Sequence, residues 1–70
     1  MTIIEIVAAR NTAWKLEPLA RLLECSRGKL YKMVKAGRMP YMTIMGMIRF
    51  DPAATAAWLA NQSFTPSRSR

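Results

Sequence analysis

The sequence lacks histidine altogether and contains a single cysteine, Cys25. One cysteine cannot form an internal disulfide, and without histidine the chain lacks the most common metal ligand and general base of proteins. These absences exclude zinc fingers, Ser-His triads and Cys-His nucleophiles. Because Cys25 has apolar neighbours, we interpret it as a small core residue rather than a redox centre. We expect neither a metal nor a cofactor.

Acidic residues are also scarce, and their positions favour a structural role. The acids are Glu5, Glu17, Glu24 and Asp51. Three of them lie at or next to predicted helix ends, where a carboxylate ordinarily caps the helix or offsets its dipole. We therefore do not expect an enzyme.

The few acids stand against eleven Lys and Arg, which gives a net charge of +7. Nucleic acid is the usual partner of so basic a domain. The cations are concentrated where acids are missing, because no acid occurs between Glu24 and Asp51. That stretch is the predicted electrostatic footprint, and its basic residues are Arg27, Lys29, Lys32, Lys35, Arg38 and Arg49.

Long hydrophobic runs are missing too, although 51% of the residues are hydrophobic. No run approaches the roughly 20 residues that span a bilayer. The first ten residues carry Glu5 within their apolar stretch and lack the basic start and cleavage site of a signal peptide. We expect one small soluble domain in the cytoplasm of a bacterial or phage-infected cell, associated with the nucleoid, with no membrane partner and no small-molecule ligand.

Two short helices joined by a tight turn are predicted in the first half of the chain. From Leu16 to Glu24 the apolar residues recur at spacings of three and four, and Pro18 suits the first turn of a helix. Ser26 is a good N-cap for a second helix that runs to about Ala36 and ends at Gly37. Residues 24–26 separate the two, which is the spacing of a helix-turn-helix.

The second helix has one apolar and one basic side. Leu30, Met33 and Val34 are expected to pack inward. The N-terminal residues of such a helix read base edges in the major groove while the first helix crosses the backbone. The predicted readers are Arg27, Gly28, Tyr31 and Lys32, with Lys29 and Lys35 as further DNA contacts.

Each predicted reader has a physical rationale and an alternative. Arg27 can bind guanine through two hydrogen bonds, whereas Lys32 does so less rigidly or contacts a phosphate. Gly28 lets the backbone approach closely. The alternatives are a merely solvated charged face and a packing role for Tyr31.

A tight β-hairpin is predicted after Pro40. Residues 41–44 and 47–50 alternate in polarity around Met45 and Gly46, and a glycine at the second position suits a two-residue turn.

The hairpin region is rich in methionine. Met33 and Met42 are expected to fill the core, whereas Met45 and Met47 have no core within reach. These two can contact sugars or bases in a minor groove, contact a neighbouring protomer, or simply be exposed.

A third helix is predicted near the C-terminal end of the chain, and a segment of ambiguous structure lies near the N-terminal end. Asp51 and Pro52 form an N-cap and a first-turn proline for a helix through about Asn61, with Trp58 as its largest core residue and with Ala54, Thr55 and Leu59 also facing inward. Residues 2–9 are rich in β-branched residues that suit a strand but are spaced for a helical face. We favour a short helix there.

From Trp14 to Leu59 the chain resembles the excisionase-type helix-turn-helix proteins, small winged-helix relatives of the MerR DNA-binding domain that include phage excisionases. The motifs that carry the resemblance are Trp14-Lys15-Leu16, Leu19-Ala20-Arg21-Leu22-Leu23, Ser26-Arg27 through Leu30-Tyr31-Lys32, Ala36-Gly37-Arg38-Met39-Pro40, Ile44-Met45-Gly46 through Ile48-Arg49-Phe50, and Ala57-Trp58-Leu59.

The resemblance implies a mainly α fold with a small β-hairpin, a winged helix-turn-helix. It implies that the second helix enters the major groove, that the wing around Gly46 reaches an adjacent minor groove, and that Arg49 contacts the backbone. The sequence departs from the family pattern at Lys15, which replaces a Ser or Thr cap, at Glu24, which replaces a glycine, and at Met47, which replaces a basic wing residue.

We accordingly divide the chain into an apolar N-terminal extension at 1–13, a winged helix-turn-helix domain at 14–61 and a flexible basic tail at 62–70. The resemblance suggests an excisionase, or recombination directionality factor, that bends attachment-site DNA and promotes integrase-mediated excision. Its partners would be double-stranded DNA, an integrase and neighbouring copies bound side by side. A small transcription regulator of the same fold and a protein-binding adaptor or antitoxin are the alternatives.

Overall fold

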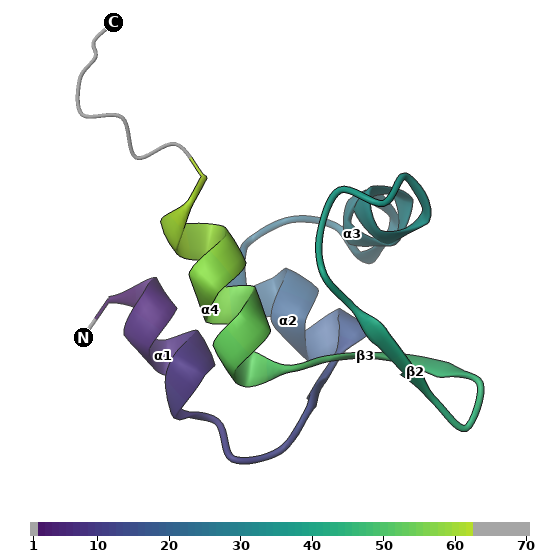
Figure 1. Ribbon diagram of the computed structural model, residues 1–70. Helices are drawn as coiled ribbons and strands as arrows, with labels where there is room; N and C mark the ends of the chain where they lie inside the picture. Colours follow the sequence, from purple (N-terminus) through teal and green to yellow (C-terminus); the bar gives the residue numbers. More distant parts are fainter. Residues whose placement is uncertain (1, 63–70) are drawn as a thin grey trace, which may run out of the picture.

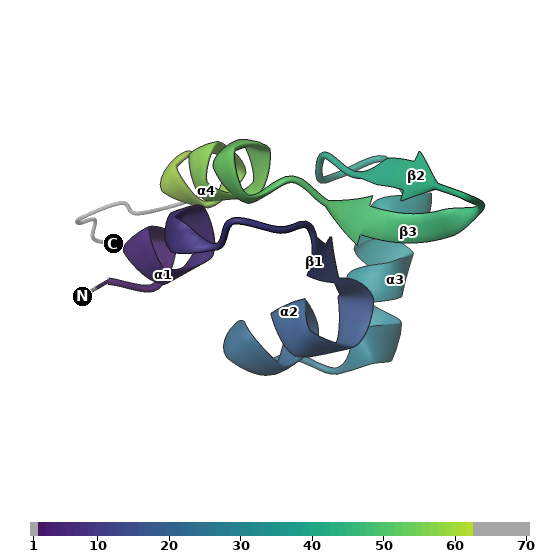
Figure 2. The same cartoon turned by 90° about the horizontal axis from the view of Figure 1, so that it is seen from below.

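The computed structural model describes residues 2–62, so residues 63–70 of the predicted basic tail lie outside the described residues (Figure 1). Helices and strands follow one another in the order α1 (Ile3–Ala9), β1 (Trp14–Lys15), α2 (Leu16–Leu22), α3 (Arg27–Lys35), β2 (Met42–Ile44), β3 (Met47–Phe50) and α4 (Pro52–Ala60). Figure 2 shows α1 and α4 side by side at one end of the molecule, with α2, α3 and the hairpin at the other. This arrangement confirms the predicted winged helix-turn-helix.

The turn between α2 and α3 begins with an unusual backbone at Glu24. Glu24 has φ +58°, in the left-handed region that ordinarily favours glycine. The Cys25 N–H donates to the carbonyl of Ala20 at 3.0 Å and the Glu24 N–H to that of Arg21 at 3.1 Å, the two hydrogen bonds of a Schellman motif. Helix α2 therefore ends at Leu22, slightly before the predicted Glu24.

Both ends of α3 are those predicted from the sequence. The Ser26 hydroxyl accepts a hydrogen bond of 3.0 Å from the backbone N–H of Lys29. At the other end Gly37 has φ +71°, and the Arg38 N–H donates to the carbonyl of Met33. Leu30 and Val34 anchor the helix because each is only 2% exposed.

Helix α1 confirms the helical interpretation of residues 2–9. Thr2 and Glu5 form a capping box: the Thr2 hydroxyl accepts from the Glu5 N–H at 3.1 Å, and the Glu5 carboxylate accepts from the Thr2 N–H at 2.8 Å. Val7 is fully buried where α1 packs against α4. The indole N–H of Trp14 donates to the Val7 carbonyl at 3.2 Å, which ties the end of α1 to the sheet.

The prediction that Trp58 is the largest core residue is wrong. Phe50 is fully buried and Trp14 is 7% exposed, whereas Trp58 is only partly buried. Thr55, which was predicted to face inward, and Ala56 are the buried residues of α4, the helix that packs against α1. Trp58 packs against the core as a partly buried residue, and its indole N–H donates to the carbonyl of Arg38. Ala54 and Leu59 are partly buried, as their predicted inward positions require.

The sheet has one strand more than the predicted hairpin. Strand β1 pairs antiparallel with β3, which pairs with β2, and Trp14 lies opposite Phe50. Met45 and Gly46 form the predicted two-residue turn, with φ +54° and +78°, as a type I′ turn requires.

The prediction that Met42 fills the core is wrong, as the register of the hairpin shows. Met42 lies opposite Arg49, on the face of the sheet away from the Trp14 and Phe50 pair, and does not join the core cluster. Met39 is the buried methionine, at 4% exposed. Met33 and Cys25 pack against the core as partly buried residues, as expected.

Candidate nucleic-acid interface

The outward side of α3 is a continuous surface of exposed polar and basic residues. Its predicted DNA-binding residues are all exposed, including Tyr31 at 43%: Arg27, Gly28, Lys29, Tyr31, Lys32 and Lys35. Since the aliphatic side of the helix is buried, the cationic side faces solvent. Helix α3 therefore presents the face that the sequence predicted.

The cations of this face are not neutralised within the fold. Among residues 2–62 the only ion pair is the exposed one between Arg21 and Glu17 of α2, with an N–O distance of 3.6 Å. The Lys35 ammonium lies 5.7 Å from the centroid of the Tyr31 ring, which places a cation beside an aromatic ring on the outer surface. The charge of α3 is thus available to an anionic partner.

A groove of about 720 Å³ separates α3 from the hairpin. The N-terminal part of α3 forms one wall and the hairpin forms the other. Five predicted DNA-binding residues line it, Arg27, Gly28, Tyr31, Gly46 and Arg49. Met47, for which a minor-groove contact was one interpretation, also lines it, as do Leu16 and Ile48, which were not predicted. Lys29, Lys32, Lys35 and Arg38 are exposed outside this lining.

The lining residues that the sequence did not indicate are apolar, and only the pairing of the strands brings them to the groove. Leu16 begins α2 directly after β1, and β1 pairs with β3. A hydrophobic residue at the start of a helix is ordinarily interpreted as core, so its type alone gave no signal.

Gly28 is not required by the fold at its position in α3. A Cβ atom added to Gly28 would meet nothing within 4 Å. The position opens directly into the groove. No other described part of the chain therefore requires a glycine at this position.

The Arg49 guanidinium is held against its own strand. Its Nη1 donates to the Ile48 carbonyl at 2.8 Å, and its Nη2 lies 3.4 Å from the Met47 sulfur. Arg49 is partly buried and lies opposite Lys15 of β1. Its charge is thus fixed at the hairpin side of the groove.

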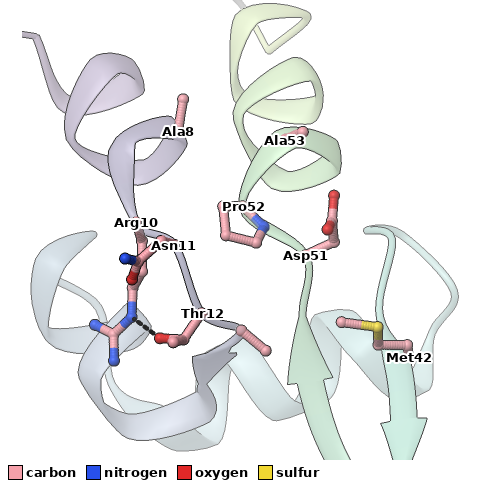
Figure 3. Close-up of a pocket in the computed structure, with 9 residues that line it drawn as sticks. Ala8, Arg10, Asn11, Thr12, Met42, Asp51, Pro52 and Ala53 are labelled. Atoms are coloured by element: carbon pink, nitrogen blue, oxygen red, sulfur yellow. Dashed lines mark hydrogen bonds between the residues drawn. The ribbon is translucent and has the colours of Figure 1, made fainter.

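A second depression, of about 320 Å³, lies between the loop after α1 and the start of α4 (Figure 3). Arg10 and Thr12 hydrogen-bond to each other there at 3.2 Å. The Asp51 carboxylate already accepts from the Ala54 N–H at 2.8 Å, as predicted for an N-cap. Arg10, Thr12 and Asp51 thus serve the local fold.

Among the described residues, no helix is long and apolar enough to cross a bilayer. Nor do residues 2–62 contain three or more Asp, Glu or Cys side chains grouped so that they could hold a metal ion.

A capped, basic second helix beside a β-hairpin defines a winged helix-turn-helix, a class of DNA-binding domain. Residues 15–63 match a family model described as a helix-turn-helix domain, and the family is excisionase-like. The chain belongs to this family, which implies DNA binding and is generally non-enzymatic. Comparisons with curated proteins and with solved structures gave no significant match. The match begins at Lys15, so α1 lies outside it.

Proposed function

We propose that this protein is an excisionase: a sequence-specific accessory protein that binds and bends attachment-site DNA and so promotes integrase-mediated excision of a phage or mobile element. The observation that carries the proposal is the exposed, unneutralised basic face of α3 beside the groove of the hairpin. Membership of an excisionase-like helix-turn-helix family supports the recombination role.

In this proposal α3 lies in the major groove. Arg27 and Lys32 hydrogen-bond to base edges, and Tyr31 contacts the same groove. Gly28 allows the backbone to approach the bases, because nothing of the chain fills the space beside it. The phosphate contacts come from Lys29, Lys35 and Arg38, three of the cations that lie outside the groove lining.

The hairpin completes the interface. The turn at Gly46 enters the neighbouring minor groove, and Arg49 contacts the backbone from its fixed position on β3. With about four to six phosphates contacted, the logarithm of the affinity falls with the logarithm of salt at a slope of about −0.9 per phosphate. A flat salt response would favour the alternative of a protein-binding adaptor.

Neighbouring copies are proposed to bind side by side along DNA and to assist an integrase. Ile3 and Ile6 of α1 are candidates for contacts between copies, since they are 40% and 37% exposed although apolar.

The deciding experiment combines footprinting on the DNA that flanks the gene with a reconstituted excision reaction. We expect protection of repeated sites beside an attachment site, and more excision product when the protein is added to integrase. A protein that alters transcription from the protected DNA but leaves recombination unchanged is a regulator, and the excisionase proposal is then wrong.

A further inference from the structure

The tip of the hairpin is apolar and exposed. Ile44 is 43% exposed, Met45 90% and Met47 46%, and the hairpin extends away from the helices (Figures 1 and 2). Large apolar side chains at such exposure gain less from their own fold than buried side chains do, and Met45 gains almost nothing. The exposure of these apolar side chains therefore points to contact with another molecule.

Met45 also has a strained backbone. Its φ of +54° belongs to a type I′ turn, in which Asn, Asp or Gly is favoured at this position. A methionine there combines an unfavourable conformation with a side chain that is almost fully exposed. Unusual backbone at an exposed position is a feature of functional sites.

The tip cannot bind an anion by charge. Residues 39–48 contain no lysine or arginine. The nearest cation on β3, Arg49, is held by the Ile48 carbonyl and lies against the Met47 sulfur. The side chains of Ile44, Met45 and Met47 can therefore contact a partner only through apolar atoms.

The charge of the groove beside the tip indicates which kind of molecule the tip contacts. Arg27 of α3 and Arg49 of the hairpin both line that groove, so their charge favours an anionic molecule there. A second copy of this chain, with a net charge of +7, does not meet that requirement. Duplex DNA does, and it also offers stacked bases to an apolar side chain.

We propose that Met45 is a wedge that enters the minor groove, partly unstacks one base step and bends the duplex. The inference rests on the proposed DNA-binding function and specifies how the bend arises. Apolar side chains inserted in this way kink DNA by roughly 20–90°. Ile44 and Met47 flank the wedge on the two strands and contact the sugars. Pyrimidine–purine steps unstack most easily, so the wedge adds a preference for such a step.

The test is the substitution Met45→Asn. Asparagine before Gly46 is a favoured type I′ pair, so the hairpin remains and the melting temperature of the free protein rises. The DNA is a duplex selected from a random pool by the wild-type protein and labelled at both ends. We expect the wild type to increase energy transfer between the ends, and Met45→Asn to lose most of that increase while it still protects the major groove.

A second probe reports unstacking directly. With 2-aminopurine at the step that the hairpin contacts, wild-type protein should raise its fluorescence and Met45→Asn should not. Met45→Leu is the matched control, because it keeps an apolar side chain of similar volume and should keep both the bend and the fluorescence increase.

Each contrary result has its own meaning. If Met45→Asn bends the duplex and unstacks the step as the wild type does, the wedge is wrong and the proposed function stands. If Met45→Asn instead abolishes self-association in sedimentation and leaves the bend unchanged, the tip binds a second copy and the wedge is again wrong. A wild type that selects no duplex at all overturns the proposed function together with the wedge.

Discussion

The indole N–H of Trp58 donates a hydrogen bond of 2.9 Å to the carbonyl oxygen of Arg38, twenty residues earlier in the chain. Arg38 follows the glycine that ends α3. The bond therefore links α4 directly to the turn behind the candidate DNA-binding helix. Through α4 that turn is also connected to α1, which packs on the same helix.

The hydrogen bond and the packing of Trp58 can be separated by two substitutions. Trp58→Phe removes the N–H donor and should lower the free energy of unfolding by about 1 kcal/mol. Trp58→Ala should cost more, about 2–3 kcal/mol, which is below the value for a fully buried aromatic residue because Trp58 is only partly buried. Urea denaturation measures both. Equal losses would show that the hydrogen bond carries the whole contribution.

Arg27 and Lys35 should affect DNA binding differently. Arg27→Ala should weaken binding to a selected duplex by about 1–3 kcal/mol more than binding to a scrambled one, since it removes base contacts. Lys35→Ala should weaken both about equally and lower the salt slope by about one. Both side chains are exposed, so melting temperatures should stay near that of the wild type. If the two variants lose the same affinity on both duplexes, Arg27 does not read bases.

Gly28→Ala should raise the free energy of unfolding and lower the affinity for DNA. Alanine is favoured over glycine within a helix by about 0.5–1 kcal/mol, and the new methyl group meets no atom of the chain. The same methyl group should weaken binding to the selected duplex, because it occupies the space through which the backbone approaches the bases. Denaturation and titration of labelled DNA test the two effects separately. Unchanged affinity would contradict close approach at this position.

Glu24→Gly should stabilise the protein by about 1 kcal/mol, because it relieves the left-handed conformation after α2. Glu24→Gln is the matched control: it removes the same charge, keeps the strained backbone and should give no comparable gain. Thermal denaturation of the three proteins compares them. A gain shared by both variants would assign the effect to charge rather than to the backbone.

Local features of the fold could be predicted at helix ends, because certain residue types strongly favour the cap positions there. The Ser26 cap, the glycine that ends α3 and the Asp51-Pro52 start of α4 were predicted and are observed. The capping box of Thr2 and Glu5 was also present in the sequence and would have resolved the ambiguity of residues 2–9.

The features that were not predicted depend on contacts between distant parts of the chain. Strand β1 is too short to show any periodicity and exists because Trp14 pairs with Phe50. The side of the sheet on which Met42 lies follows from its register with Arg49, and polarity alone gives no register. The partial burial of Trp58 likewise depends on its contact with a distant part of the chain, the turn that contains Arg38.

The apolar residues of the candidate site also depend on contacts between distant parts of the chain. The cations of α3 were predictable because they share one helix, whereas Leu16 and Ile48 reach the groove beside Arg27 only after the strands pair.

Buried residues of α3 are Leu30 and Val34, and its two ends are held by a serine cap and a glycine turn. The positions that hold the helix in place are thus different from those on its exposed side. The residues at positions 27, 28, 31 and 32 can therefore be substituted together without loss of the fold. This makes the small domain a suitable scaffold for selecting variants with altered DNA target preference from a library.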